Sequence, residues 1–156
     1  MKAIGNGKDY EGNRHSPSQW AYLAGIIDGE GCIRVSNTTK DRKVRSLSLI
    51  ITNTDVRLIE WLRERFNGSA YSRGKGCWNV EWHSRRAKPI LLNTLPFLII
   101  KEEQAELGIA FIRLMGRKSS VEGKNRKPRV SPDRLAKRLA IQEALSILKH
   151  RVKNKL

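Results

Sequence analysis

Two carboxylates, Asp28 and Glu30, stand one residue apart at the end of a segment with helical spacing. Apolar side chains recur upstream of them, at Trp20, Leu23, Ala24 and Ile27. The segment is predicted to begin at Pro17 behind a Ser16 cap and to end in a tight glycine turn before a strand. A carboxylate at a helix C-terminus is disfavoured by the macrodipole, so a bound cation would explain the pair. The alternative is a buried helix ended by an ordinary Asp-Gly turn.

The middle of this predicted helix carries very small residues, because Ala24 is followed by Gly25. Glycine inside a helix costs about 1 kcal/mol relative to alanine, so its presence indicates a packing reason. Another backbone can approach closely there. We therefore expect a helix–helix contact beside an acidic, metal-binding helix end.

The composition favours a nucleic-acid partner. The 156 residues include 31 Lys and Arg against 15 Asp and Glu, a net charge of +16. A folded chain this basic most often binds nucleic acid, with an anionic membrane or plain solubility as weaker alternatives. Cys32 and Cys77 lack zinc-site spacing, and the three histidines are too scattered to form a metal site. With no signal-like or membrane-spanning apolar run, we expect an intracellular protein without a membrane partner.

Periodicity predicts one α+β domain. Strands with period-two alternation are expected over residues 32–38, 47–52 and a hairpin at 70–84, and helices over 17–27, 55–66 with a Thr54 cap, 89–95 and 101–115. The predicted order is αββαββα, with a mobile tail at 1–15 and one domain over 16–156. That domain divides into a core at 17–115, a basic connector at 116–130 and a C-terminal helix at 131–153. A four-stranded antiparallel sheet with helices on one face would leave its other face open.

The open face and the basic segments are the predicted DNA-contacting surface. Trp78, Val80 and Trp82 alternate toward the core, whereas Arg, Asn and Glu on the other face can read base edges. The candidates are Arg34, Ser36, Thr38, Lys40, Arg42, Lys43, Arg45, Ser48, Arg73, Lys75, Asn79, Glu81, His83, Lys118, Lys124, Arg126, Lys127 and Arg129. A solvated sheet face is the competing interpretation, and a register slip of one residue would exchange the two faces.

The stretch from Leu23 to Gly31 resembles the motif of the LAGLIDADG homing endonucleases. It matches that motif at Leu23, Ala24, Gly25, Ile27, Asp28 and Gly31, with Glu30 replacing one acid by another. The αββαββα order is also that of this family, so the resemblance covers about residues 17–115. It implies a saddle-shaped sheet over double-stranded DNA. One motif copy implies a homodimer that binds a pseudo-palindromic site, hydrolyses both DNA strands and leaves 3′ overhangs.

The resemblance also implies roles for individual residues. Divalent metal, usually Mg²⁺, would be bound by Glu30 and the Gly29 carbonyl, with Mn²⁺ as a substitute and Ca²⁺ binding without cleavage. Asn53, Arg57 and Lys101 are the implied catalytic partners of Glu30. The implied dimer interface consists of Trp20, Leu23, Ala24, Gly25, Ile27 and Asp28.

Two other classes of function stay open. The first is a non-cleaving binder on the same fold, either an intron RNA maturase or a transcriptional regulator. A maturase role can coexist with cleavage, since the basic C-terminal region suits RNA as well as DNA. The second is a basic ribosomal or architectural protein, which would explain the charge but not the motif. The small size favours a freestanding, intron-encoded product.

Overall fold

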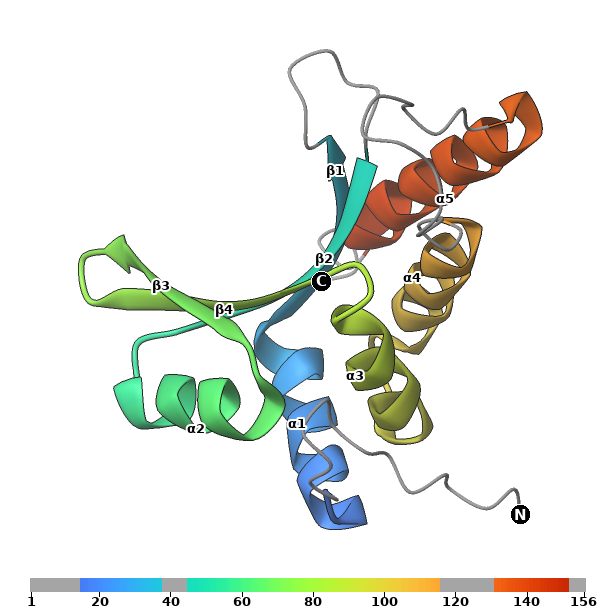
Figure 1. Ribbon diagram of the computed structural model, residues 1–156. Coiled ribbons are helices and arrows are strands. Elements are labelled where there is room, and N and C mark those ends of the chain that lie inside the picture. The colour runs from blue at the N-terminus through green and yellow to red at the C-terminus, as the bar shows by residue number, and fades with distance from the viewer. Residues whose placement is uncertain (1–14, 38–44, 116–130, 152–156) are drawn as a thin grey trace, which may run out of the picture.

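The computed structural model describes residues 15–37, 45–115 and 131–151 (Figure 1). Its elements in chain order are α1 (Pro17–Glu30), β1 (Gly31–Asn37), β2 (Arg45–Asn53), α2 (Val56–Phe66), β3 (Ser69–Gly74), β4 (Cys77–His83), α3 (Ala87–Thr94), the short 3₁₀ helix η1 (Leu95–Phe97), α4 (Glu102–Leu114) and α5 (Pro132–Arg151). The predicted αββαββα order is confirmed. The tail before residue 15, the connector at 116–130 and the last residues of the predicted C-terminal helix lie outside the described residues.

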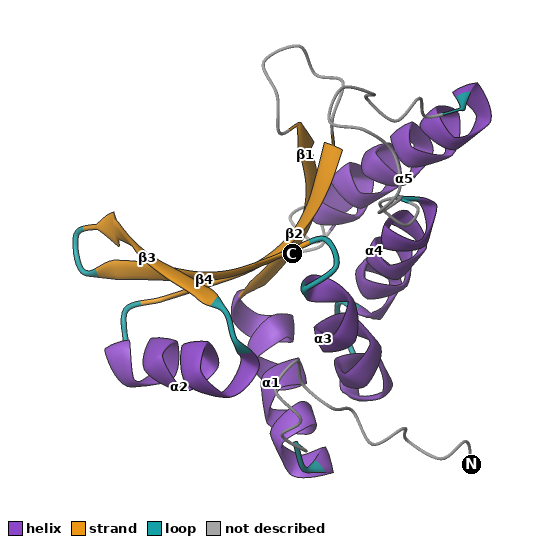
Figure 2. Ribbon diagram, in the orientation of Figure 1, coloured by secondary structure: helices purple, strands orange, loops and turns teal. Residues whose placement is uncertain are grey.

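The four strands form one antiparallel sheet in the order β1-β2-β4-β3. Figure 2 shows a curved sheet, with α1, α2, α3 and α4 on one side of it. None of the described helices lies on the opposite face, which we call the open face. The helix α5 packs along α4 and the edge strand β1. This is the predicted α+β architecture, with helices on one face of the sheet.

The hydrophobic core contains the strand residues that period-two alternation predicted to face the helices. Leu47, Leu49 and Ile51 on β2 are completely buried against the helices. On β4 the indole of Trp82 is buried and its Nε1 donates to the Phe66 carbonyl at 2.7 Å, which ties α2 to the sheet. Apolar side chains spaced by two residues thus place one face of each hairpin in the core.

The motif helix runs directly into β1 without the predicted turn between them. The α1 helix continues through Glu30, and Gly31 caps it in an extended conformation. A Cβ at Gly31 would lie 2.5 Å from the Ile27 carbonyl oxygen, so only glycine allows the chain to leave the helix this closely. Asp28 and Glu30 therefore lie in the last helical turn.

The predicted cap of the second helix was wrong. The cap of α2 is Asp55 rather than Thr54, with the Asp55 carboxylate accepting the Arg57 N–H. Both residue types cap helices, and the spacing alone did not separate neighbours. On α5, Leu135 and Leu139 are exposed at 37% and 42%. Among the described residues no helix is long and apolar enough to cross a membrane.

Candidate active site and nucleic-acid interface

The last turn of α1 anchors the segment that leads into α4. One Asp28 carboxylate oxygen accepts the Ile99 N–H at 2.8 Å and the other accepts the Lys101 N–H at 2.9 Å. The Lys101 ammonium donates back to the Asp28 main-chain carbonyl. Backbone donors, rather than a cation, therefore account for this carboxylate at the helix C-terminus. Asp28 positions Lys101.

The ammonium of Lys101 lies partly buried beside the motif. Burial lowers the pKa of its ammonium, while the nearby charges of Asp28, Cys32 and Glu30 oppose that shift. Glu30 itself is exposed. Glu30 and Lys101 are far apart in the sequence but lie at the same end of α1. Glu30 supplies an exposed carboxylate there and Lys101 a half-buried ammonium, and both are among the predicted site residues.

The donor atoms at this helix end suit a hard cation. The last carbonyls of a helix lack intrahelical partners, and those of Ile27 and Asp28 are taken by the Gly31 N–H and the Lys101 ammonium. The Gly29 carbonyl follows them, beside the Glu30 carboxylate, and both offer the oxygen ligands that Mg²⁺ and Ca²⁺ prefer. No three His, Cys, Asp or Glu side chains gather around a common point in the described part of the chain. One copy therefore offers a partial ligand set.

Asn53 and Arg57 both bind Asp55 beyond the end of β2. The Asn53 side-chain oxygen accepts the Asp55 N–H at 2.8 Å, and Arg57 holds the Asp55 carboxylate through Nε and Nη2 at 3.0 and 2.6 Å. The hydrogen bond from Arg57 lowers the pKa of Asp55 to about 2. The Arg57 side chain is 90% exposed, so salt and water screen this pair. No recorded contact joins Asn53 or Arg57 to Glu30 or Lys101 within the described ranges, and their catalytic roles stay predictions.

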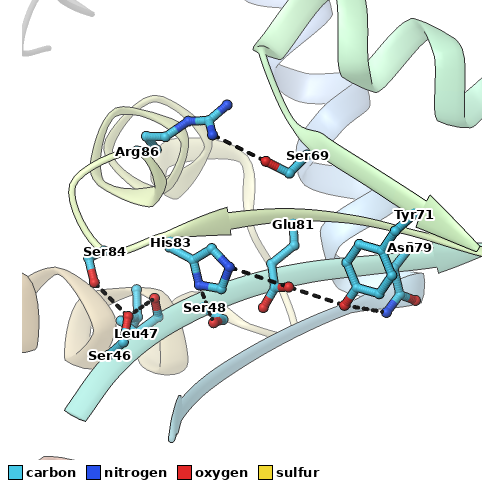
Figure 3. A network of polar contacts seen from close by, with 10 residues as sticks. All are labelled: Ser46, Leu47, Ser48, Ser69, Tyr71, Asn79, Glu81, His83, Ser84 and Arg86. Carbon is cyan, nitrogen blue, oxygen red and sulfur yellow. Dashed lines mark hydrogen bonds and ion pairs between the residues drawn. The ribbon is translucent and has the colours of Figure 1, made fainter. Parts of the chain in front are cut away.

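A connected set of polar side chains lies on the open face (Figure 3). Tyr71 donates its hydroxyl to Glu81 at 3.1 Å and accepts from the Asn79 amide at 3.0 Å. Thr52 donates to the Asn79 oxygen at 2.7 Å. These residues come from β2, β3 and β4, and the register pairs Thr52 with Asn79 and Asn79 with Tyr71. Hydrogen bonds across three strands therefore fix this part of the face.

The same network continues toward β1 through His83. The His83 Nδ1 and the Ser48 hydroxyl are 3.0 Å apart, and its Nε2 lies 3.5 Å from a Glu81 carboxylate oxygen. Glu81 is thereby held between Tyr71 and His83. We call the six residues Thr52, Asn79, Tyr71, Glu81, His83 and Ser48 the open-face network.

The predicted DNA-contacting residues differ in their exposure. Arg34, Arg73, Lys75 and His83 are exposed, and Ser36 is half-buried. Ser48, Asn79 and Glu81 are buried at 2%, 6% and 7% exposure, so little of these three side chains is accessible to a partner. The predicted contacts at Thr38, Lys40, Arg42, Lys43, Lys118, Lys124, Arg126, Lys127 and Arg129 lie outside the described residues.

Arg45 is placed differently from the prediction. It precedes Leu47 by two residues and so shares the face of the buried β2 side chains. Its Nε donates to Gln142 of α5 at 2.7 Å. Arg45 therefore points to the helical side of the sheet rather than to the open face.

Sequence reasoning missed Tyr71 and Thr52. Tyr71 is 42% exposed and links Asn79 to Glu81. The available signal was the period-two alternation of the predicted hairpin, which sets Tyr71 on the face opposite to the core-facing Ala70.

The predicted dimer interface needs a correction. Trp20, Leu23, Ala24 and Ile27 are at most 4% exposed and pack in the core of their own chain. They cannot be the surface of α1 that meets a partner. The exposed side of this helix carries Tyr22, Gly29 and, from the predicted set, Gly25, and a Cβ at either glycine would meet nothing within 4 Å. A small-residue surface is available, but on the opposite side of the motif helix.

Comparison with known proteins identifies the fold. No family model matches the sequence, and no curated protein matches it significantly. Among solved structures, homing endonuclease I-CvuI in complex with its target has a TM-score of 0.70 at 19% identity, covering 85% of this chain and 82% of that one. Archaeal intron-encoded homing endonuclease I-Vdi141I complexed with DNA has a TM-score of 0.67 at 15% identity, covering 84% of each chain.

LAGLIDADG meganuclease I-AabMI, bound to uncleaved DNA, has a TM-score of 0.62 at 22% identity. The match covers 82% of this chain but only 44% of that one, so this chain spans less than half of the longer protein. The fold of this chain is therefore the LAGLIDADG homing endonuclease fold.

Proposed function

We propose that this protein is a site-specific DNA endonuclease that acts as a homodimer and uses a divalent cation to hydrolyse both strands. The observation that carries the proposal is the exposed Glu30 carboxylate beside the half-buried Lys101 ammonium at the end of α1. The similar folds of homing endonucleases solved with DNA support it. A pseudo-palindromic target and 3′ overhangs belong to the same proposal.

Phosphodiester hydrolysis forms a bond from a water oxygen to phosphorus and breaks the bond from phosphorus to the 3′ oxygen. The water loses a proton and the 3′ oxygen gains one. Glu30 and the Gly29 carbonyl would hold Mg²⁺, with the remaining oxygen ligands coming from the second copy, DNA and water. When bound, the cation would supply an activated water and stabilise the leaving oxygen.

Lys101 would stabilise the negative charge that develops on the phosphate oxygens. Its ammonium is half-buried, and a cation removed from water stabilises a developing charge more strongly than an exposed one. Asp28 keeps it in place through the backbone of the segment that begins α4. Asn53 and Arg57 would order water or phosphate from the end of β2.

DNA would lie on the open face of the sheet. This face carries Arg34 and His83 as exposed side chains, and Arg73 and Lys75 are exposed at the end of the β3–β4 hairpin, on a chain with a net charge of +16. A two-stranded β-ribbon fits the major groove, where Arg and Lys recognise guanine. The open-face network would fix the orientation of Tyr71 and His83 against the base edges.

The test is cleavage of a randomised DNA library with Mg²⁺, run for the wild type, Glu30→Gln and Glu60→Gln. Glu60 is an exposed acid on α2 and serves as the matched control. We expect defined cuts at one long, roughly two-fold symmetric site for the wild type and Glu60→Gln. Glu30→Gln should bind that site without cutting it. An active Glu30→Gln enzyme would contradict the assignment.

Sequence-specific binding by the wild type without any cut would favour the non-cleaving alternatives. Binding of intron RNA by the wild type and Glu30→Gln alike would then indicate a maturase. Binding of duplex DNA alone would indicate a transcriptional regulator. Each result is distinct from loss of folding, which circular dichroism of the same samples reports.

A further inference from the structure

The hydrogen bonds of the open-face network have a fixed direction, because a carboxylate ends them. An ionised carboxylate can only accept, so the Tyr71 hydroxyl donates to Glu81 at 3.1 Å (Figure 3). With its proton used there, the Tyr71 oxygen accepts from the Asn79 amide nitrogen at 3.0 Å. The Asn79 oxygen is thereby turned toward Thr52, whose hydroxyl donates to it at 2.7 Å. Every donor in this row thus points along the network toward Glu81.

A second branch of the network ends at the same carboxylate oxygen. The His83 Nε2 faces it at 3.5 Å, and the His83 Nδ1 lies 3.0 Å from the Ser48 hydroxyl. In either protonation state of the ring, both nitrogens face protein groups. His83 is exposed, but what it offers to a base is its ring carbons.

Exposure decides which members of the first row a base can reach. Asn79 and Glu81 are 6% and 7% exposed, whereas Tyr71 is 42% exposed and Thr52 is half-buried. Tyr71 and Thr52 lie on either side of Asn79 in one row across β3, β4 and β2. The proton of each hydroxyl is held inside the network, which leaves oxygen lone pairs for a ligand. We call Thr52 and Tyr71 the acceptor pair.

We propose that the acceptor pair selects an amino base, adenine or cytosine, in the major groove of the bound duplex. This inference rests on the proposed function, which lays DNA on the open face. Adenine N6 and cytosine N4 carry the hydrogen-bond donors of the major groove, whereas guanine and thymine present the acceptors O6 and O4. An oxygen whose own proton is held by the protein can bind the first two bases. Against the other two it sets one lone pair against another.

A hydroxyl outside such a network does not discriminate in this way. Its proton rotates to suit a donor or an acceptor on the base, and for this reason serine and threonine contact several bases. Glu81 removes that freedom although it is itself buried. Glu81 is therefore a positioning residue, and Thr52 and Tyr71 make the contact.

The test compares Glu81→Gln with Ser69→Ala, which removes an exposed hydroxyl from β3 outside the network. Bound duplexes are selected from a randomised library without Mg²⁺, and each base at each position of the selected site is then compared by competition. At one position of each half-site the wild type should favour adenine or cytosine over guanine and thymine by about fivefold.

Glutamine can donate as well as accept, so Glu81→Gln releases the Tyr71 proton and should lose this preference. Preferences at the other positions should stay as in the wild type, and Ser69→Ala should keep them all. If no position distinguishes Glu81→Gln from Ser69→Ala, the inference is wrong.

A change in the DNA tests the same contact in a wild-type protein, and so decides the matter even if Glu81→Gln does not fold. The amino group is removed by replacing adenine with purine, or cytosine with 2-pyrimidinone, at the position found. The wild type should lose about fivefold in affinity. The double variant Thr52→Val and Tyr71→Phe, checked for folding by thermal unfolding, should lose much less. Equal losses, or no loss for the wild type, would overturn the inference.

The same measurements separate this inference from the proposed function. If the wild type selects a site and cuts it with Mg²⁺, but Glu81→Gln selects the same bases, the acceptor pair does not read the amino group and the endonuclease proposal stands. If the wild type shows the preference but cuts nothing, the inference stands and the cleavage proposal is wrong. If the wild type selects no duplex, both are wrong.

Discussion

The carboxylate of Asp28 accepts the backbone N–H of Lys101 at 2.9 Å, and the Lys101 ammonium donates to the Asp28 carbonyl. The two residues are bonded both ways although 73 positions separate them. One acid of the motif is therefore used to hold a second segment against the helix end. This leaves Glu30, two residues later, exposed for ligand binding.

Asp28→Asn should reduce both stability and cleavage. Asparagine keeps one acceptor oxygen but places an NH₂ group against a backbone N–H, so one of the bonds to Ile99 and Lys101 is lost. An unsatisfied donor of this kind costs about 1–3 kcal/mol in unfolding free energy, which urea denaturation measures. Cleavage should fall because Lys101 shifts. Asp133→Asn on α5 is the control and should change neither quantity by much; an Asp28→Asn protein equal to it would contradict the positioning role.

Because the pKa of Lys101 is lowered, the cleavage rate should begin to fall at a pH below the ordinary lysine pKa. Burial lowers its pKa from 10.5, so its stabilising charge is lost at a lower pH than for a solvated lysine. Cleavage rates measured from pH 7 to 10.5 should fall on the alkaline side. In Lys101→Arg the fall should move to higher pH, because arginine stays protonated there. Identical pH profiles for the wild type and Lys101→Arg would show that the Lys101 charge has no part in the reaction.

The same shift predicts how Lys101 affects stability. The Lys101 ammonium has a lower pKa in the folded chain than in the unfolded chain. At pH values where it is protonated in both states, its burial therefore lowers the free energy of unfolding. The free energy of unfolding should therefore rise with pH from the folded pKa up to 10.5. Lys101→Met should lack this rise. The effect is small because water still reaches the side chain.

The sequence predicted the sheet and its faces because both depend on local alternation. The pattern at Leu47, Leu49 and Ile51 needs no knowledge of the partner strand to show that these residues share a face. The burial of Ser48 and Glu81 could not be predicted in this way. It depends on cross-strand neighbours such as Tyr71 and His83, which only the register identifies.

For the motif helix, the sequence pattern likewise could not predict which neighbour a face contacts. Helical spacing showed that Leu23 and Ile27 share one side, but a period does not say whether that side meets its own sheet or a partner. The structure places it in the core. In contrast, Lys101 was implied by the family resemblance and not by the period of one face, and the charge of Glu30 does act on its ammonium. Its catalytic role stays a prediction.

Tyr71→Phe should weaken recognition of the target more than general DNA binding. It removes the hydroxyl that joins Asn79 to Glu81, leaving two buried groups with fewer partners. Stability should fall by about 1–2 kcal/mol. Binding should discriminate less between the target and sites with single base changes, as measured by competition. Ser69→Ala removes an exposed hydroxyl from the same strand and should leave discrimination intact; equal discrimination in both variants would exclude a recognition role for the network.

Gly25→Leu should separate dimer formation from folding. A Cβ at Gly25 meets nothing within 4 Å in the single chain, so the fold has room for a side chain there. In the proposed homodimer the partner helix occupies that room, and a leucine would keep the two α1 helices apart. We expect a folded monomer in sedimentation experiments, with cleavage lost. Removing glycine from the helix interior should by itself stabilise the isolated chain by up to about 1 kcal/mol.

Gly108→Ala is the matched control for that substitution. Its Cβ would lie 3.2 Å from Leu91 Cδ1 and 3.3 Å from the side chains of Ile33 and Leu47, all inside one chain. These tight contacts and the removal of a helix glycine act in opposite directions on the stability of this variant. It should keep the wild-type association state, because the change lies in the core. If Gly25→Leu remains a dimer and cleaves normally, the exposed side of α1 is not the contact between copies. Cleavage by a protein that sediments as a monomer at all working concentrations would contradict the homodimer itself.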